Sequence, residues 1–313
     1  MKIARFSHAT SCSRRLILWL ISAVLLSLPY RAGAQLYIGQ EDSHRVGKYD
    51  ANTGATSNAN FITGLGGPQG LLLSGNTLFV STFSAGTVGT YNASTGAAIN
   101  ASFITRVSGA RGLALSGNNL FVTNNGGNTV GEYNATTGAA INANLVGGFI
   151  NAYGLAISGN NIFVSDPNFG GVFEYDITTG KSSGFGFITL SSPASLALSG
   201  NNLFVVIGGS SSVGKYDATT GAAINGSLVT GLSSPAGLAL SGNNLYVANA
   251  ATNIVGEYNA TTGAAINASL VSTGAFTNPS SLAVVQTPEP TTVVLTAIGA
   301  LALLGRNTRR RRR

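Results

Sequence analysis

The chain has 313 residues, of which 44% are hydrophobic and 9% are charged, and this composition excludes a disordered, highly charged chain. The formal net charge is +7, but eleven of the seventeen basic residues lie before residue 35 or after residue 305. The body between them carries six basic and nine acidic residues, so we expect no basic stripe and no nucleic-acid partner.

Residues 1–34 have the three parts of a secretory signal peptide. Four basic residues lie within residues 1–15, Leu16 to Leu28 form an apolar run, and Ala32-Gly33-Ala34 is a small-x-small cleavage site. We predict a signal helix that directs the chain to the Sec export machinery and is cleaved after Ala34. The alternative is an uncleaved anchor, for which the apolar run is short.

Residues 35–287 are built from a repeat of 41 or 42 residues. Its first mark is Ser-Gly-Asn, which starts at Ser74, Ser116, Ser158, Ser199 and Ser241. Its second mark is a tyrosine followed by Asp or Asn, at Tyr49, Tyr91, Tyr133, Tyr175, Tyr216 and Tyr258. Short runs rich in β-branched and aromatic residues predict four strands in each unit, as at 113–115, 120–123, 130–133 and 140–146.

Four-stranded units of this length are typical of a β-propeller. The first strand of the unit occurs six times, and so do the other three strands. Five units are complete, and two partial units remain at the ends of the body. The N-terminal part supplies three strands that start at Leu36, and the C-terminal part supplies one first strand at Ser281 to Val285. We therefore predict an all-β, six-bladed β-propeller whose first blade is closed by N-terminal and C-terminal strands, because this closure removes open sheet edges.

The connections and glycines of the unit have their own signals. Asn134 to Gly138 reads as a type I turn that begins with a side-chain cap and ends with a left-handed glycine. Gly131 and its equivalents fall inside the third strand, which indicates either a bulge or a close approach by the neighbouring sheet. The fourth unit departs from the pattern, with Phe173 at that glycine position.

The body resembles the NHL and YVTN-type propeller repeats. Leu120-Phe121-Val122-Thr123-Asn124 matches the second type, and Pro235-Ala236-Gly237-Leu238-Ala239 matches the start of an NHL unit. The resemblance implies a fold that serves mostly as a scaffold for interaction. Propellers of these families that are lactonases or lyases carry acids and histidines on channel-facing loops, and this sequence does not show that cluster.

Few residues of the body could carry chemistry. It has one histidine, His44, and no cysteine, so zinc sites and nucleophilic triads are nearly excluded, and we expect no cofactor and no metal. The residues at the end of each second strand could form a ring at one mouth of the channel: Gln40, Thr82, Asn124, Asp166, Ile207 and Asn249. Either a weak cation site or capping of the loops would explain the Asp and Asn residues of this ring.

The positions where the units differ are candidates for a binding surface. They are Glu41, His44, Arg106, Arg111, Tyr153 and Asp166. The alternative for Glu41 to Arg45 is a solvated loop. Arg and Tyr are favoured at contact surfaces, and for this reason we single out Arg106, Arg111 and Tyr153.

Residues 288–313 form a tail with three parts. Pro288-Glu289-Pro290 precedes an apolar stretch, residues 291–305, and then Arg306 and a run of arginines at 309–313. This order resembles the PEP-CTERM sorting signal of Gram-negative bacteria. The resemblance implies an exosortase as processing partner, transient membrane contact through a short helix at 291–305, and delivery to the cell surface or extracellular matrix. A permanent single-span anchor is the alternative.

Together these features predict an exported, non-catalytic β-propeller that binds an extracellular polysaccharide or protein. The alternative function is a propeller lyase or lactonase-like hydrolase with a weak metal site, which would use Asp166 or the region from Glu41 to His44.

Overall fold

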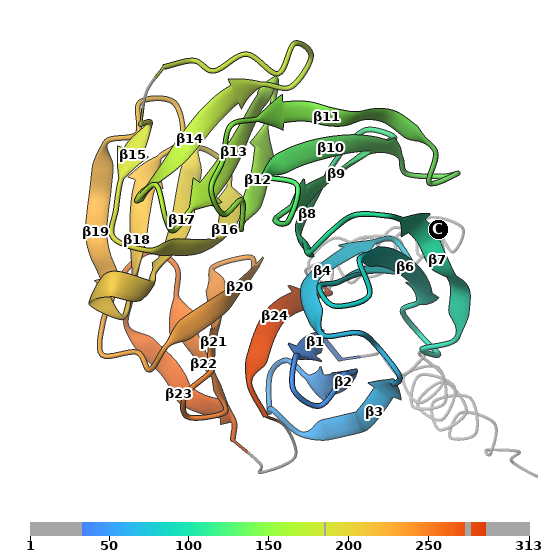
Figure 1. Ribbon diagram of the computed structural model, residues 1–313. Coiled ribbons are helices and arrows are strands. Elements are labelled where there is room, and N and C mark those ends of the chain that lie inside the picture. Colours follow the sequence, from blue (N-terminus) through green and yellow to red (C-terminus); the bar gives the residue numbers. More distant parts are fainter. Residues whose placement is uncertain (1–32, 185, 273–276, 286–313) are drawn as a thin grey trace, which may run out of the picture. The chain divides into compact units, whose positions relative to one another are not determined.

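Six four-stranded antiparallel sheets follow one another around a central axis in the computed structural model of the protein (Figure 1). The structure describes residues 33–184, 186–272 and 277–285. The predicted tail at 288–313 lies outside these ranges. The predicted signal helix also lies outside them, because only residues 33 and 34 of the signal segment are described. Within them, no helix is long and apolar enough to cross a membrane.

Each sheet is one blade, with an inner strand at the axis and an outer strand at the rim. The inner strands are β24 (Pro279–Val284), β4 (Pro68–Ser74), β8 (Ala110–Ser116), β12 (Leu155–Ser158), β16 (Pro193–Ser199) and β20 (Pro235–Ser241). The second strands are β1 (Gln35–Gln40), β5 (Thr77–Thr82), β9 (Asn119–Asn124), β13 (Asn161–Asp166), β17 (Asn202–Ile207) and β21 (Asn244–Asn249). We number the blades 1 to 6 in this order.

The other two positions complete each sheet. The third strands are β2 (Arg45–Asp50), β6 (Thr87–Asn92), β10 (Thr129–Asn134), β14 (Gly171–Asp176), β18 (Ser212–Asp217) and β22 (Ile254–Asn259). The outer strands are β3 (Thr56–Ile62), β7 (Ala98–Thr105), β11 (Ala140–Gly147), β15 (Ile188–Thr189), β19 (Ala223–Val229) and β23 (Ala265–Val271). The divergent fourth unit has the shortest of these outer strands, β15.

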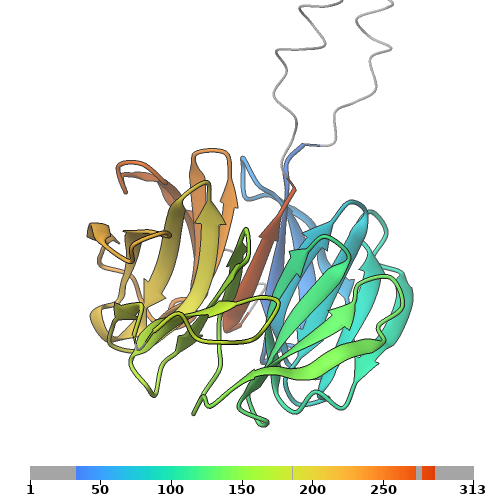
Figure 2. The ribbon, with the colours of Figure 1, turned by 90° about the horizontal axis from the view of Figure 1, so that it is seen from above.

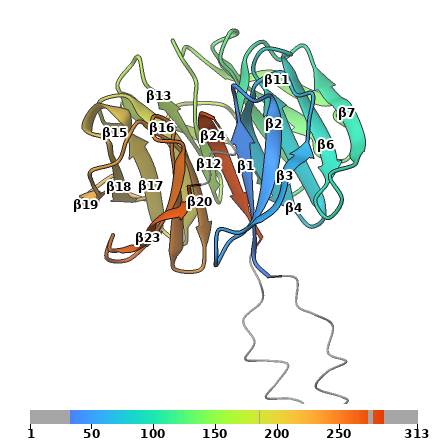
Figure 3. The ribbon, with the colours of Figure 1, turned by 90° about the horizontal axis from the view of Figure 1, so that it is seen from below.

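The first blade closes as the strand count predicts. β24, from the end of the body, pairs antiparallel with β1, from its beginning, with Leu36 opposite Val284 and Ile38 opposite Leu282. Figure 3 shows the two strands side by side. The inner strand β24 also contacts β20 and β4 on either side, so the ring is continuous. The predicted six-bladed propeller with four-stranded blades is confirmed.

The alternation of antiparallel strands divides the connections between two faces of the ring, as the side view in Figure 2 shows. The turn face carries the Ser-Gly-Asn hairpins and the turns between third and outer strands. The loop face carries the hairpins between second and third strands and the connections from one blade to the next. These loop-face connections are where the repeat units differ most in sequence.

The turn between β10 and β11 has the predicted chemistry. The Oδ1 atom of Asn134 accepts hydrogen bonds from the backbone N–H groups of Thr136 and Thr137, both at 2.9 Å. Gly138 follows with φ at 74°. A Cβ atom at Gly138 would lie 2.1 Å from the carbonyl oxygen of Phe103 in blade 2, so this glycine is needed for its conformation and for blade packing.

The glycine inside each regular third strand marks a bulge, one of the two predicted alternatives. The register between β10 and β11 shifts on both sides of Glu132, next to Gly131. A Cβ atom at Gly131 would lie 2.7 Å from Cε2 of Tyr133 and 2.9 Å from the carbonyl oxygen of Ala143. The close neighbours therefore belong to the same sheet, and the tyrosine ring covers the glycine of its own strand.

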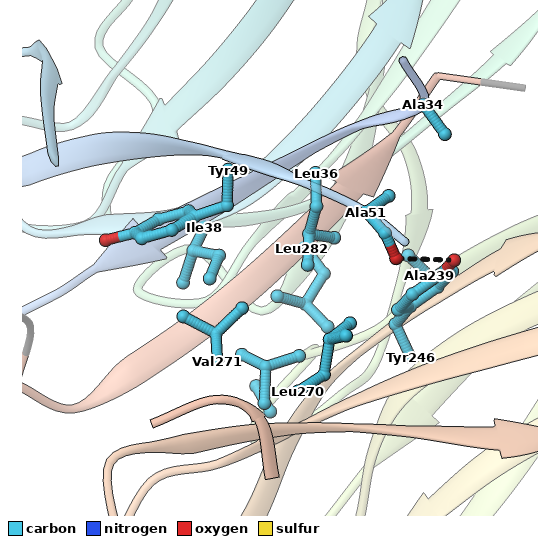
Figure 4. Packing of buried hydrophobic residues seen from close by; sticks show 12 residues of the cluster. Ala34, Leu36, Ile38, Tyr49, Ala51, Ala239, Tyr246, Leu270, Val271 and Leu282 are labelled. Carbon is cyan, nitrogen blue, oxygen red and sulfur yellow. Dashed lines mark hydrogen bonds between the residues drawn. The ribbon is translucent and has the colours of Figure 1, made fainter. Parts of the chain in front are cut away.

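The hydrophobic core lies between the blades as six clusters, each shared by two neighbouring sheets. Figure 4 shows the cluster between blades 6 and 1, where Leu36 and Ile38 pack against Val271. All three side chains are fully buried. The closing blade therefore has an apolar contact with blade 6 of the same kind as the other neighbouring pairs.

Candidate functional site

The candidate site lies where the inner strands begin, at the loop face. Each inner strand begins with, or in blade 4 is preceded by, Pro or Ala, one variable residue and Gly or Ser, and a Leu follows. We call the six variable residues the mouth ring: Gln69, Arg111, Tyr153, Ala194, Ala236 and Ser280. Three consecutive blades thus contribute long polar side chains, and the other three contribute small ones.

Below the mouth ring, the axis holds a cavity of about 80 Å³. All six inner strands or their leading residues line it, mainly through the Gly or Ser and the Leu that follow each mouth-ring residue, and Gln69, Tyr153 and Ser280 line it too. The glycines keep this channel narrow, since a Cβ atom at Gly112 would lie 2.6 Å from the carbonyl oxygen of Tyr153. Only a small group could enter it.

Hydroxyl groups fix the backbone of the mouth ring. The Thr123 hydroxyl of β9 donates to the carbonyl of Tyr153 at 2.9 Å and accepts from the N–H of Gly112 at 2.7 Å. In the preceding blade, the Ser81 hydroxyl donates to the carbonyl of Arg111 at 2.5 Å. Because these bonds run from one blade to the next, they set the positions of Arg111 and Tyr153 relative to each other.

The Arg111 guanidinium lies between two aromatic rings. Its central carbon is 4.7 Å from the ring centroid of Phe83 and 4.3 Å from that of Tyr153. Such contacts are favourable because the face of an aromatic ring is negative. The Nε atom of Arg111 is buried, and no hydrogen-bond partner for it is found in the described part of the chain. Arg111 is thus a positioned cation with an unused donor.

Two charged groups influence Tyr153. Burial raises the pKa of its phenol, the positive charge of Arg111 lowers it, and the negative charge of Glu41 raises it. Glu41 comes from the loop between β1 and β2, and its Oε2 atom accepts a hydrogen bond of 3.4 Å from Asn278. The mouth therefore has a cation held against Tyr153 and an anion that acts on the same phenol.

Two more buried polar atoms at the axis have no hydrogen-bond partner within the described residues: Oε1 of Gln69 and the Ser281 hydroxyl. The side chain of Gln69 is 8% exposed and that of Ser281 is 6% exposed, and both line the cavity. An unsatisfied buried polar group costs about 1 to 3 kcal/mol. The mouth and cavity therefore hold hydrogen-bonding capacity that the chain itself does not use.

Asp166 organises loops. Its carboxylate is fully buried and accepts four backbone hydrogen bonds: from Ile150 at 2.8 Å, Asn151 at 3.0 Å, Asn168 at 2.9 Å and Phe169 at 3.0 Å. Both carboxylate oxygens are used, one for each of two loops. The side chains of Ile150 and Phe169 are thereby left about half exposed on the loop face.

The other residues that end the second strands also serve their own blades. Gln40 accepts from Nε of Arg45 at 2.8 Å, Asn124 from the N–H of Gly127 at 2.9 Å, and Asn249 from the N–H of Ser233 at 3.0 Å. Thr82 bonds to Thr87. None of the six lines the axial cavity. Loop capping, one of the two alternatives considered for the Asp and Asn residues, describes Asp166, Asn124 and Asn249.

The remaining sequence candidates, His44 and Arg106, do not line the axial cavity. His44 is exposed with φ at 52°, and its Nδ1 accepts from the N–H of Gly67 at 3.2 Å. Arg106 is exposed with φ at 65° in the connection between blades 2 and 3. Across the described ranges, no group of three or more His, Cys, Asp and Glu residues is placed to hold a metal ion.

The structure thus brings together Arg111 and Tyr153, with Glu41 acting electrostatically on the Tyr153 phenol, and adds Gln69 and Phe83, which the sequence did not single out. Gln69 has a signal in the sequence, because it occupies the same repeat position as Arg111 and Tyr153. Phe83 has none, since its contact with Arg111 joins a loop of blade 2 to the inner strand of blade 3.

No family model matches the chain, and no curated protein matches it. Among solved structures, a chain in the crystal structure of a nidogen/laminin complex is similar, with a TM-score of 0.69 and 15% identity over 80% of this chain and 98% of that chain. The computationally designed Ika8 protein has a TM-score of 0.48 and 18% identity, over 78% of this chain and 73% of that chain. The first likeness supports the propeller fold alone.

Proposed function

We propose that this chain is an exported, non-catalytic binding protein that uses the loop face of its propeller to hold a polysaccharide or protein outside the cell. The observation that carries the proposal is the set of unused polar atoms at the mouth: Nε of Arg111, Oε1 of Gln69 and the Ser281 hydroxyl. A ligand with matching acceptors and donors would satisfy them and gain affinity from doing so.

The hydrogen bonds made by Asp166 and Glu41 favour a binding role over the lyase or hydrolase alternative. A catalytic carboxylate needs an oxygen free to reach a substrate. Both oxygens of Asp166 are held by backbone amides. Glu41 accepts a hydrogen bond from Asn278, which also donates to Asp42, and the described residues hold no group of three or more His, Cys, Asp and Glu that could bind a metal ion.

The route out of the cell is part of the proposal and rests on the sequence. Residues 1–34 would direct export, and the PEP-CTERM-like tail would be recognised through Pro288, Glu289 and Pro290 and removed by an exosortase. The NHL or YVTN-type character of the repeats likewise rests on their sequence, and fits a scaffold whose loops vary while its turns repeat.

Mass spectrometry of the protein recovered from a Gram-negative host with an exosortase tests the route. We expect an N-terminus at Gln35 and loss of residues 291–313. Retention of the tail would instead establish a permanent anchor. Binding of the recovered protein to glycan and protein arrays tests the function, and a protein that binds no ligand on either array contradicts it.

A further inference from the structure

We propose that the mouth of the propeller binds the carboxylate of an acidic sugar, a uronic acid unit of an extracellular polysaccharide, with Arg111 as the anchor. The inference rests on the proposed function and names its ligand class. It is carried by Gln69 and Tyr153, which line the axial cavity, and by Arg111, whose guanidinium lies against the Tyr153 ring.

The mouth ring carries long side chains on one side only. Gln69, Arg111 and Tyr153 occupy three consecutive blades, whereas Ala194, Ala236 and Ser280 occupy the other three. A side chain no larger than Ser leaves space that the long residues opposite do not fill. The axial cavity of about 80 Å³ continues below this space. A ligand can therefore rest on the side of small residues and point its charged group at Arg111.

Arg111 is prepared for a carboxylate. Its guanidinium is held 4.3 Å from the Tyr153 ring centroid and 4.7 Å from the Phe83 ring centroid, so little side-chain entropy remains to be lost on binding. Its Nε has no acceptor within the described residues. A planar carboxylate accepts two parallel hydrogen bonds from an arginine, and such charge-assisted bonds are stronger than neutral ones.

The second requirement is hydroxyl groups on the ligand. Oε1 of Gln69 is an acceptor that lacks a donor, and the Ser281 hydroxyl lacks any partner in the described residues, while both line the cavity. Sugar hydroxyls donate and accept hydrogen bonds and are small enough to enter the cavity, so a ring that stays at the mouth can satisfy both groups through its hydroxyls. The side chain of an acidic amino acid has a carboxylate but no hydroxyl, and for this reason we favour a uronic acid over an acidic peptide.

The charge of the site favours a widely spaced polyanion over a dense one. Arg111 is the single cation of the mouth ring, and Glu41 acts on the same phenol with the opposite sign. The body as a whole has nine acidic and six basic residues. A nucleic acid needs several cations along its backbone. A polysaccharide can offer one carboxylate to Arg111 and keep its other charges in solvent.

Isothermal titration calorimetry of the full chain with an oligogalacturonate tests the proposal. The matched ligand is the same oligomer after its carboxylates have been reduced to primary alcohols. We expect the acidic oligomer to bind at least tenfold more tightly than the reduced one. We expect Arg111→Ala to lose at least tenfold in affinity for the acidic oligomer while it keeps a cooperative unfolding transition. The arginines at 306–313 are the same in every variant, so their background attraction cancels when variants are compared with one another.

Two further variants make the result specific. Arg106→Ala removes a loop-face guanidinium that is exposed and does not belong to the mouth ring, and its affinity should stay within twofold of the unchanged protein. Ala236→Gln fills the side of small residues without touching Arg111, and it should lose binding. Equal losses in Arg106→Ala and Arg111→Ala, or full binding by Ala236→Gln, would overturn the proposal.

The same titrations separate this proposal from the proposed function. A poly-glutamate peptide that binds through Arg111 as tightly as the oligogalacturonate would overturn the sugar class, although the chain would still be a binding protein. Tight binding of the reduced oligomer would overturn the role of the carboxylate, again with the binding function intact. A protein that stays inside the cell, or binds nothing on the arrays, defeats the proposed function itself.

Discussion

The phenol of Tyr246 donates a hydrogen bond of 3.3 Å to the backbone carbonyl of Ala51, across the boundary between blades 6 and 1 (Figure 4). On the other side of blade 1, the phenol of Tyr37 donates to the carbonyl of Ala93 at 2.6 Å. The equivalent residues of the other four blades are phenylalanines, at positions 79, 121, 163 and 204. The two tyrosines therefore join blade 1 to both of its neighbours. Blade 1 is the blade in which β24 and β1, from opposite ends of the body, pair without a covalent link.

Replacement of Tyr246 by Phe tests the value of this contact. The change keeps the ring and removes the buried hydroxyl, which has the Ala51 carbonyl and, at 3.4 Å, the Glu257 carboxylate as acceptors, so we expect a loss of about 1 kcal/mol in the free energy of unfolding. Urea denaturation of the variant measures it. Tyr37→Phe should behave alike. The two sites lie on opposite boundaries of blade 1, so the double variant should lose about the sum of the two effects. An unchanged midpoint in all three variants would show that these bonds contribute nothing to closure.

Gly131 offers a test of the covered glycine in the third strand. An alanine Cβ at this position would lie 2.7 Å from the Tyr133 ring and 2.9 Å from the Ala143 carbonyl oxygen. We expect Gly131→Ala to cost about 1 to 3 kcal/mol of folding free energy, because the ring and the bulged strand must move. Gly147→Ala is the matched control, since its Cβ would meet only a methyl group of Thr129, at 3.8 Å. Its expected change is within about 0.5 kcal/mol.

The fold could be predicted because its determinants are local and repeated. The cap of Asn134 on Thr136, the left-handed Gly138 and the apolar strands recur in step, and counting them gives the blade number and the closure. The site was only partly predictable. Arg111 and Tyr153 departed from the repeat and were found, but the contact of Phe83 with Arg111 joins two blades and leaves no mark in either unit.

Substitution of Asp166 tests whether this acid has a structural or a functional role. Asp166→Asn keeps the size of the side chain but replaces one of the two accepting oxygens by a donor, so up to two of the four backbone N–H groups lose their acceptor. We expect a loss of about 1 to 3 kcal/mol in stability. Calcium should not change the unfolding temperature of either protein by linkage. Asn124→Ala, which removes a single such bond at the equivalent position of blade 3, is the control and should cost less.

Alkaline pH should unfold the protein through its tyrosines. Burial raises the pKa of all nine tyrosines of the described body, and that of Tyr246 rises from 10.0 to about 12. The folded state then holds protons that the unfolded chain releases above pH 10, so stability is intact below pH 10 and falls as the pH rises toward 12. Tyr246 alone would account for about 2 to 3 kcal/mol at pH 12. Urea midpoints measured from pH 8 to 11.5 check this, and Tyr246→Phe should show a shallower fall. A midpoint that holds constant over that range would mean that the phenols ionise in the folded ring as freely as in the unfolded chain.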